Sequence, residues 1–325
     1  MTTLDTISAH PAARPGLIPS LIKLARPHQW VKGAFVIVGP AYGIATGTAQ
    51  LTVGLGVAIL GAFLAFGFAS SSCYVVNDIR DREADKLHPR KRNRPIASGA
   101  VPLGTAKAFS FALLGCSAGA MLLALANESR GAWIAMSPVL WLAAFVAGYV
   151  VNTTLYSLKF KQAVVLDVIS LATGFVIRVL GGCAAAGVTP STFLLNCTFF
   201  VSMFLAFGKR LGERRTMGDQ AGAARAVQQK YTDDLLRMAV MVSGVVSLVS
   251  YAGYIQDSGK KYELGFNLLW LTILPATYGL LRCIVLLERG QYDDPTELAS
   301  KDRPFQGALV LFGIITFAVM YGLHK

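Results

Sequence analysis

Charged side chains are scarce in this sequence. Asp, Glu, Lys and Arg together make up 15% of its 325 residues, whereas a soluble globular domain carries about 25%. A soluble protein of this length would need more polar surface than so few charges supply. The shortage argues against a soluble fold. Because 54% of the residues are hydrophobic, the sequence instead indicates a protein surrounded by lipid.

Cysteine motifs are also lacking. The five cysteines all lie among apolar residues, and none has the C-x-x-C spacing. A disulfide framework and a thiolate metal site are therefore not expected, and each cysteine is interpreted as a small buried hydrophobic residue. They are Cys73, Cys116, Cys183, Cys197 and Cys283.

The beginning of the chain lacks the basic start and apolar core of a cleavable signal peptide. Because this stretch is polar and contains proline and alanine, we expect residues 1–20 to be a disordered cytoplasmic segment. No domain boundary is visible after it. Residues 21–325 are therefore expected to form a single transmembrane domain.

Long apolar runs are what the sequence has in abundance. Runs of near 20 residues recur along the whole chain without the alternation typical of strands. This pattern predicts an all-α integral membrane protein with nine transmembrane helices. The expected spans are 26–47, 52–78, 102–126, 132–156, 164–186, 190–209, 232–256, 265–288 and 305–323. Pro40, Pro138 and Pro275 are among the prolines that lie inside these spans.

Basic residues give the chain a net charge of +12. On a soluble protein this excess would suggest nucleic acid as a partner, but here the bases lie in short loops between apolar runs, so no nucleic-acid partner is expected. If the N-terminus is cytoplasmic, the cytoplasmic loops are 80–101, 157–163, 210–231 and 289–304. The opposite side then receives only four of the 30 basic residues: Arg130, Lys260, Lys261 and Lys325. This asymmetry predicts a plasma-membrane protein with its C-terminus on the side opposite the cytoplasm.

The densest charge cluster of the chain begins with the motif NDIRDREAD. If the second span continues through it, Asn77, Asp81 and Asp85 stack on one helix face, with Asp78 beside them. Nothing obvious in the sequence neutralises these carboxylates, and like charges at this spacing repel. Oxygen ligands together with substrate phosphates suit Mg²⁺. The alternative is a solvated charged loop in which Arg80, Arg82 and Lys86 pair with the acids.

The same stretch then becomes basic. These bases can follow from membrane topology alone, since cytoplasmic loops collect Lys and Arg. They can equally form a cradle for a diphosphate, in which a metal bridges phosphate oxygens and the bases neutralise the remainder. The bases are Lys86, Arg90, Lys91, Arg92 and Arg94.

The acidic stretch resembles the N-D-x-x-D-x-x-x-D motif of the UbiA prenyltransferase superfamily, and the resemblance extends over nearly the whole chain. It implies a nine-helix bundle with an active-site cavity that faces the cytoplasm. It also implies that Asn77, Asp78, Asp81 and Asp85 bind Mg²⁺ and the diphosphate of a donor, with Asp81 and Asp85 as the catalytic pair. One feature departs from the family: FGKRLGERRTMGDQ carries Glu213 and Asp219, where a second D-x-x-x-D motif is usual.

Four further stretches are similar to the decaprenyl-phosphate phosphoribosyltransferase branch of that superfamily. They are KLARPHQWVKG, KRNRPIASG, YSLKFKQAVVLDV and GFVIRVLGG. The resemblance implies a glycosyltransferase that moves 5-phosphoribose from 5-phosphoribosyl diphosphate to a polyprenyl monophosphate of the decaprenyl type. The pathway stays open between cell-envelope biosynthesis and sugar decoration of a secreted molecule. An aromatic prenyltransferase of quinone or haem biosynthesis is the second hypothesis, and a transporter the third. The oligomeric state stays open, a homo-oligomer included.

Substrates with three anionic groups require several binding residues. The candidates are Lys32, Arg80, Lys91, Arg94, Tyr156, Lys161, Asp167, Arg178, Lys209 and Arg210. Arg178 lies deep in an apolar span, where a charge is costly unless it pairs or binds a ligand. Asp167 is the available partner, about three turns away. It accepts hydrogen bonds from the ribose in the alternative interpretation.

Neither histidine near the acidic motif is expected to act as a general base. A phosphate has its second pKa near 6, so the acceptor is mostly dianionic at pH 7 and is its own nucleophile. His28→Ala and His88→Ala should therefore keep turnover within about tenfold, whereas loss of a general base costs about 10²–10⁴-fold. A hundredfold loss of turnover in either variant, with expression and donor binding intact, contradicts this expectation.

Overall fold

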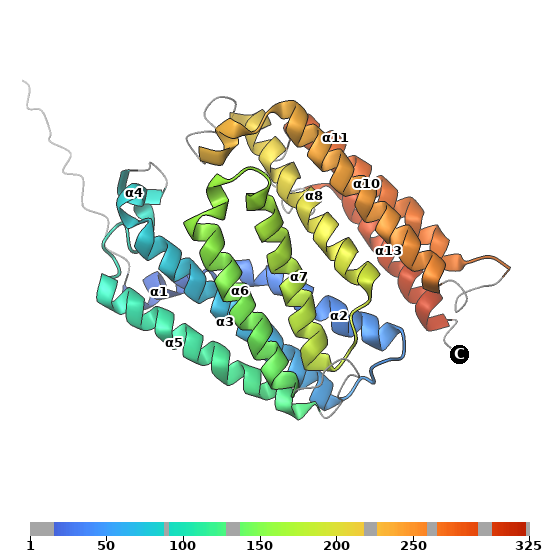
Figure 1. Ribbon diagram of the computed structural model, residues 1–325, viewed down its shortest axis with the longest axis horizontal. Coiled ribbons are helices and arrows are strands. Elements are labelled where there is room, and N and C mark those ends of the chain that lie inside the picture. The colour runs from blue at the N-terminus through green and yellow to red at the C-terminus, as the bar shows by residue number, and fades with distance from the viewer. Residues whose placement is uncertain are drawn as a thin grey trace, which may run out of the picture. The chain divides into compact units, whose positions relative to one another are not determined.

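The computed structural model describes residues 16–87, 91–127, 137–217, 226–258, 265–291 and 301–322. Within these ranges the chain forms helices and connecting turns and no β-strand, which confirms the expected all-helical class (Figure 1). Eight helices are long and apolar enough to cross a membrane in this part of the chain.

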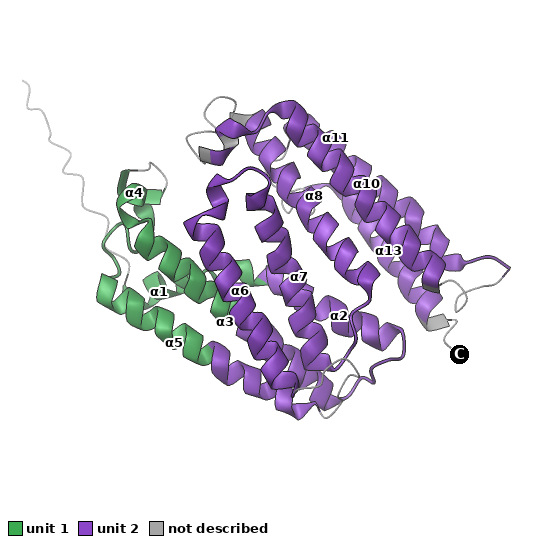
Figure 2. Ribbon diagram, in the orientation of Figure 1, with its two compact units in different colours: residues 1–30, 67–116 green, residues 31–66, 117–325 purple. Residues whose placement is uncertain are grey.

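The described residues form two compact units (Figure 2). Unit 1 comprises described residues within Met1–Trp30 and Gly67–Cys116, and unit 2 comprises those within Val31–Phe66 and Ser117–Lys325. The single transmembrane domain expected for the chain remains a prediction.

Unit 1 contains α1 and the end of a long helix, α3, that also belongs to unit 2. Its elements are α1 (Leu17–Ala25), most of the 3₁₀ helix η1 (Pro27–Gly33), the second half of α3 (Val53–Arg80), α4 (Arg82–Leu87), η2 (Lys91–Asn93) and the first part of α5 (Leu103–Met121). Its buried core consists of Leu24, Val75, Ile96, Val101, Ala106 and Leu113. The disorder expected up to residue 20 is wrong for residues 17–20, which are helical.

Unit 2 holds most of the remaining helices. They are α2 (Ala34–Ala45), η3 (Leu122–Ala126), α6 (Pro138–Leu158), η4 (Phe160–Gln162), α7 (Leu166–Ala186), α8 (Thr192–Met217), η6 (Ala226–Lys230), α10 (Asp233–Ser258), η8 (Leu268–Thr272), α11 (Ile273–Glu288) and α13 (Arg303–Gly322). Helix α7 packs against α2, α6 and α8, while α8 packs against α10 and α11 against α13 (Figure 1).

The first expected span differs from the structure. Residues 26–47 do not form one helix, because Pro27–Gly33 form a 3₁₀ helix and α2 covers only Ala34–Ala45. Arg26, just before Pro27, takes a left-handed conformation (φ 53°) at the end of α1. A proline cannot continue the preceding helix, since it lacks the backbone N–H. The chain therefore passes through the 3₁₀ helix η1 before α2 begins at Ala34.

Two further boundaries also differ. Helix α8 continues to Met217, so the basic stretch from Lys209 to Arg215 is helical and not a loop. Pro138 stands at the first position of α6 and not inside it. A proline is well tolerated there, because the first N–H of a helix has no intrahelical acceptor.

Helices α2 and α7 approach closely through small residues. A Cβ atom at Gly182 would fall on the backbone carbonyl of Val36, and one at Gly39 would fall on the sulfur of Cys183. Small residues allow such contact between membrane helices, where packing is a main source of attraction. Glycine is therefore required at this crossing.

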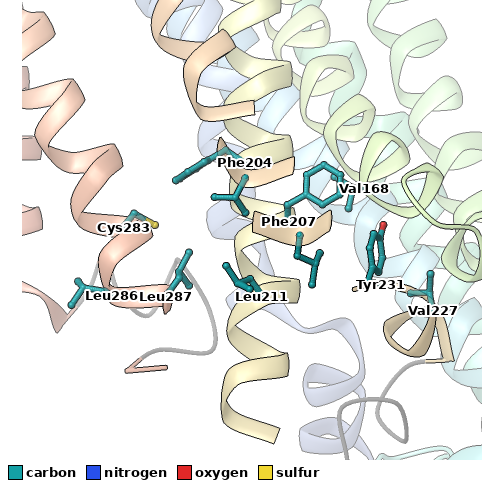
Figure 3. Packing of buried hydrophobic residues seen from close by; sticks show 11 residues of the cluster. Val168, Phe204, Phe207, Leu211, Val227, Tyr231, Cys283, Leu286 and Leu287 are labelled. Atoms are coloured by element: carbon teal, nitrogen blue, oxygen red, sulfur yellow. The ribbon is translucent and has the colours of Figure 1, made fainter. Parts of the chain in front are cut away.

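The apolar core around α8 includes a tyrosine that arrives from the segment before α10. Figure 3 shows Tyr231 beside Val227 and close to α8, whose residues Phe207 and Leu211 belong to the same cluster. All four of these side chains are at most 2% exposed. The cluster fixes this segment against α8.

Ion pairs join the ends of α8, α10 and α11. Asp233 accepts from Arg214 Nε at 2.7 Å and pairs with Arg215 at 3.1 Å. Glu288 pairs with Arg215 at 3.2 Å and accepts from Arg237 Nε at 2.9 Å. These five residues, all partly exposed, form the helix-end cluster.

Gly182→Ala should destabilise the protein, because the added methyl group meets the backbone of α2 and not a flexible side chain. Overpacking of this kind costs about 1–3 kcal/mol, so the unfolding temperature of the detergent-purified protein should fall. Gly148→Ala in α6 is the matched control, since nothing lies within 4 Å of the position that its methyl group would take. Equal unfolding temperatures for both variants would contradict the close crossing.

Candidate functional site

The acidic motif lies where α3 passes into α4. Asp81 N–H donates to the Asn77 carbonyl at 2.9 Å, and Asp85 N–H donates to the Asp81 carbonyl at 2.8 Å. The helical hydrogen-bond pattern therefore continues through the motif, although Asp81 is a turn residue between the two helices. The spacing of one helical turn between these three residues is as the sequence predicted.

Two arginines neutralise part of the motif. Arg26 Nη2 donates to both oxygens of Asp78, at 2.7 and 2.8 Å. Arg94 Nη1 donates to Asp78 at 3.1 Å and to Asp85 at 2.7 Å. The expectation that nothing neutralises these carboxylates was wrong. Both are buried, with exposed fractions of 2% for Asp78 and 3% for Asp85, so the charge pairing is what makes their burial tolerable.

Arg26 is a site residue that sequence reasoning missed. Its guanidinium also lies over the ring of Tyr74, 4.9 Å from the centroid. A residue other than glycine with a positive φ is uncommon and costs about 1–3 kcal/mol, so the surroundings must hold it. The available signal was its place in the motif KLARPHQWVKG, just before a proline that ends the helix.

The remaining acid of the motif is in a different environment. Asn77 Nδ2 donates to Asp81 Oδ2 at 3.1 Å, and both side chains are partly exposed. Arg82 and Lys86 bond to Glu83 of the same stretch, so these two bases pair within the charged stretch as the charged-loop alternative has it. Among the three aspartates of the motif, Asp81 is thus the one that solvent reaches best.

The motif supplies only oxygen ligands, which is the donor set that Mg²⁺ prefers. Within the described ranges, no three His, Cys, Asp or Glu side chains already converge on one point as a finished metal site. Both oxygens of Asp78 are engaged by Arg26. The residues that fit a divalent cation are therefore Asn77, Asp81 and Asp85.

A second set of charged residues is buried in unit 2. Asp167, at the start of α7, is fully buried, and Arg210 of α8 is 1% exposed. Asp167 accepts from Tyr231 Oη at 2.5 Å and from Arg210 Nε at 3.2 Å. Tyr231 Oη in turn accepts from the Val165 N–H at 2.7 Å. Burial raises the pKa of the Tyr231 phenol, which keeps this hydroxyl a hydrogen-bond donor.

This network changes the interpretation of two candidate residues. Asp167 and Arg210 were expected to bind substrate, yet each is enclosed and bonded to the other. Their geometry is that of a structural tie between α7 and α8. Tyr231 was not anticipated, because nothing in the sequence connects it with residues more than 60 positions away. We therefore assign neither Asp167 nor Arg210 a substrate contact.

Arg178 does not pair with Asp167, although that pair was one of the alternatives. Its Nη2 donates to Tyr149 Oη at 2.7 Å, and its Nη1 donates to the Gly174 carbonyl at 3.2 Å. Tyr149 lies on α6, so Arg178 links the two helices through a neutral group. Like Tyr231, Tyr149 was not among the residues that the sequence singled out.

The other candidates lie at partly or fully exposed positions. Arg80 is exposed, whereas Lys32, Lys91, Tyr156, Lys161 and Lys209 are half-buried. Lys161 belongs to the short helix η4 between α6 and α7. Their substrate contacts remain predictions, and His88 and Asp219 lie outside the described residues.

Comparison with known proteins places this arrangement in a family. Residues 34–300 match the model of the UbiA prenyltransferase family. The chain belongs to this family. The match confirms the resemblance carried by the acidic motif.

Relatives of known name cover almost the whole chain. The decaprenyl-phosphate phosphoribosyltransferase of Mycolicibacterium smegmatis is 32% identical over 92% of this chain and 92% of its own length. The protein of the same name from Mycobacterium tuberculosis is 30% identical over 98% of this chain and 99% of its own. A UbiA homolog from Archaeoglobus fulgidus, solved bound to GPP and Mg²⁺, aligns with a TM-score of 0.63 at 18% identity. That alignment covers 93% of this chain and 99% of the solved one.

Asp167→Asn should lower stability strongly, because the buried guanidinium of Arg210 then keeps only the carboxylate of Glu213, which lies farther away at 3.6 Å. Breaking a buried ion pair in this way costs about 3–5 kcal/mol, which thermal unfolding in detergent will show as a large drop in the midpoint. Asp81→Asn is the control, since its partly exposed side chain should change the free energy of unfolding by no more than about 0.5 kcal/mol. Asp167→Asn with wild-type stability would refute the structural role.

Proposed function

We propose that this protein transfers the 5-phosphoribosyl group of 5-phosphoribosyl diphosphate to a polyprenyl monophosphate of the decaprenyl type and releases diphosphate. The observation that carries this proposal is the 32% identity, over 92% of both chains, with a relative named decaprenyl-phosphate phosphoribosyltransferase. Family membership makes the protein a membrane-embedded transferase. The acceptor lipid is then delivered within the bilayer that surrounds it.

The acidic motif is the proposed binding site of the donor diphosphate. Asn77, Asp81 and Asp85 would hold the cation, and Asp78 would position Arg26 through their ion pair. A bound Mg²⁺ supplies charge neutralisation for the leaving diphosphate. Arg94 is close to the same group, since it bonds to both Asp78 and Asp85. The motif therefore combines the oxygen ligands of a cation with guanidinium groups that can bind phosphate oxygens.

The proposed reaction is a substitution at C1 of the ribose. An oxygen of the lipid phosphate forms the new bond to C1, the C1–O bond to the diphosphate breaks, and its electron pair leaves with the diphosphate. No proton has to be transferred, because the acceptor is already an anion at pH 7. The bases of the chain, Lys161 and Lys32 among them, would hold the anionic groups in place.

Orientation follows from the same proposal. The donor is a cytosolic metabolite, and the acidic motif lies in the loop region that the basic asymmetry assigns to the cytoplasm. We therefore place the N-terminus in the cytoplasm and the C-terminus on the opposite side of the plasma membrane.

A transfer assay in membranes tests the function. Radiolabelled 5-phosphoribosyl diphosphate is incubated with a short polyprenyl phosphate, and the lipid fraction is extracted. Lipid-extractable label that depends on the protein supports the proposal. Label that instead appears only with an isoprenyl diphosphate and an aromatic acceptor would assign the protein to the aromatic prenyltransferases.

Asp81→Ala and Asp85→Ala should each reduce turnover by several orders of magnitude, because the cation and the diphosphate lose their ligands together. Excess EDTA should abolish the activity of the wild type. Glu83→Ala is the matched control: it removes an acid of the same stretch whose bonds go to Arg82 and Lys86 and which is not one of the proposed cation ligands. Near-normal turnover of either aspartate variant would contradict the proposal that these residues bind the cation.

A further inference from the structure

Arg178 is a buried cation whose neighbours are neutral. It lies in the membrane-spanning helix α7, with an exposed fraction of 6%. Its hydrogen bonds go to the hydroxyl of Tyr149 and to the carbonyl of Gly174. Among the described residues no carboxylate lies within ion-pair distance of it. The positive charge is therefore solvated by dipoles and rings without being compensated by an anion.

Such a charge is expensive at membrane depth. Intramembrane arginines usually face a cavity, pair with an acid or mark a ligand site. The acid on the same helix cannot serve as the partner, because Asp167 is enclosed and already bonded to Arg210 and Tyr231. The surrounding groups thus fix the position of Arg178, and its positive charge stays available to an anionic ligand.

The guanidinium is held in a defined direction. Its bond to the Gly174 carbonyl, one turn earlier, shows that the side chain runs back toward the Leu166 end of α7. Two aromatic rings flank it, with centroids 4.3 Å away for Tyr149 and 5.4 Å away for Phe175. This arrangement brings the charge nearer to the Leu166 end of α7, which follows η4 and Lys161 in the chain, in the way that long basic side chains extend toward a membrane surface.

Polar groups continue from Arg178 toward that end. Asn152 Nδ2 donates to the Ser170 carbonyl at 2.9 Å, and Ser170 Oγ donates to Asn152 Oδ1 at 3.0 Å. A methyl group at Gly174 would lie 3.6 Å from Asn152 Nδ2 and 3.9 Å from Arg178 Nη1. The glycine therefore stands between the amide and the guanidinium, and together they form one polar strip along α6 and α7.

We propose that Arg178, oriented by Tyr149, is the binding residue for a phosphomonoester. A planar guanidinium matches two phosphate oxygens at once, and a dianion supplies the countercharge that Arg178 lacks. This inference rests on the proposed function, in which two substrates carry such a group: the 5-phosphate of the donor and the phosphate of the acceptor lipid. Tyr149 is a positioning residue, since it acts through Arg178.

Binding of small probes tests the site without turnover. The unfolding temperature of the detergent-purified wild type is measured in the presence of two pairs of probes. One pair is farnesyl phosphate and farnesol, and the other is ribose 5-phosphate and ribose. One phosphorylated probe should raise the unfolding temperature more than its unphosphorylated counterpart. If it is farnesyl phosphate, Arg178 binds the acceptor. If it is ribose 5-phosphate, Arg178 binds the donor.

Variants assign that shift to the residue. Arg178→Gln should abolish the phosphate-dependent shift, and Arg178→Lys, which keeps the charge but loses the fork, should weaken binding of that probe by about tenfold or more. Tyr149→Phe keeps the ring and removes the hydroxyl, and it should weaken binding of the same probe to a smaller extent. Binding of the other probe should not change in any of them.

Two outcomes overturn the proposal. One is a phosphate-dependent shift that is as large in Arg178→Gln as in the wild type. The second outcome applies if Arg178→Gln does not fold: phosphate binding is then unchanged in both Arg178→Lys and Tyr149→Phe. Arg178 would in that case be only a structural link between α6 and α7. The proposed function fails separately, when the wild type transfers no label from 5-phosphoribosyl diphosphate although the probes bind.

Discussion

The buried carboxylate of Asp167 is the interaction on which much of unit 2 depends. Its two oxygens accept from Tyr231 and Arg210, so one side chain joins α7, α8 and the segment before α10. Tyr231 also holds the backbone of Val165, which has a positive φ of 68°. A β-branched residue adopts this conformation only under constraint. The network thus sets where α7 begins and how η4 connects α6 to it. It also affects Arg178, because Asp167, the acidic residue of α7, is bonded to Arg210 and Tyr231 and therefore does not pair with Arg178.

The helices were largely predictable from the sequence, because long apolar runs leave few alternatives to membrane spans. Eight expected spans have counterparts among the candidate membrane helices. The first expected span was wrong because its first part forms the 3₁₀ helix η1, and hydropathy does not distinguish a 3₁₀ helix from an α-helix. The end of α8 failed for a related reason. Its basic last turns look like a loop in composition, but Arg210 is buried there beside Asp167, 43 positions earlier, and Leu211 is buried in a core that includes residues from much later in the chain.

The candidate site was predictable only in part. Residues one helical turn apart share a face by geometry alone, so the register of Asn77, Asp81 and Asp85 followed from spacing. Countercharges did not, because Arg26 reaches Asp78 across 52 positions of sequence. The motif KLARPHQWVKG was a signal for Arg26, but a lone sequence does not say which acid that arginine pairs with. The same limit explains why Asp167 was taken for a substrate ligand: an acid in an apolar span is conspicuous, but whether an arginine already faces it depends on helix packing.

The two sets of ion pairs in unit 2 differ in what the solution can reach. The helix-end cluster keeps partly exposed side chains at the ends of α8, α10 and α11. Dissolved ions therefore screen it, since the Debye length falls to about 3 Å at 1 M ionic strength. The Asp167–Arg210 pair is shielded by the surrounding helices, with exposed side-chain fractions of 0% and 2%. A change in ionic strength should therefore weaken or strengthen the ion pairs at the ends of α8, α10 and α11. The buried pair that joins α7 to α8 should respond much less.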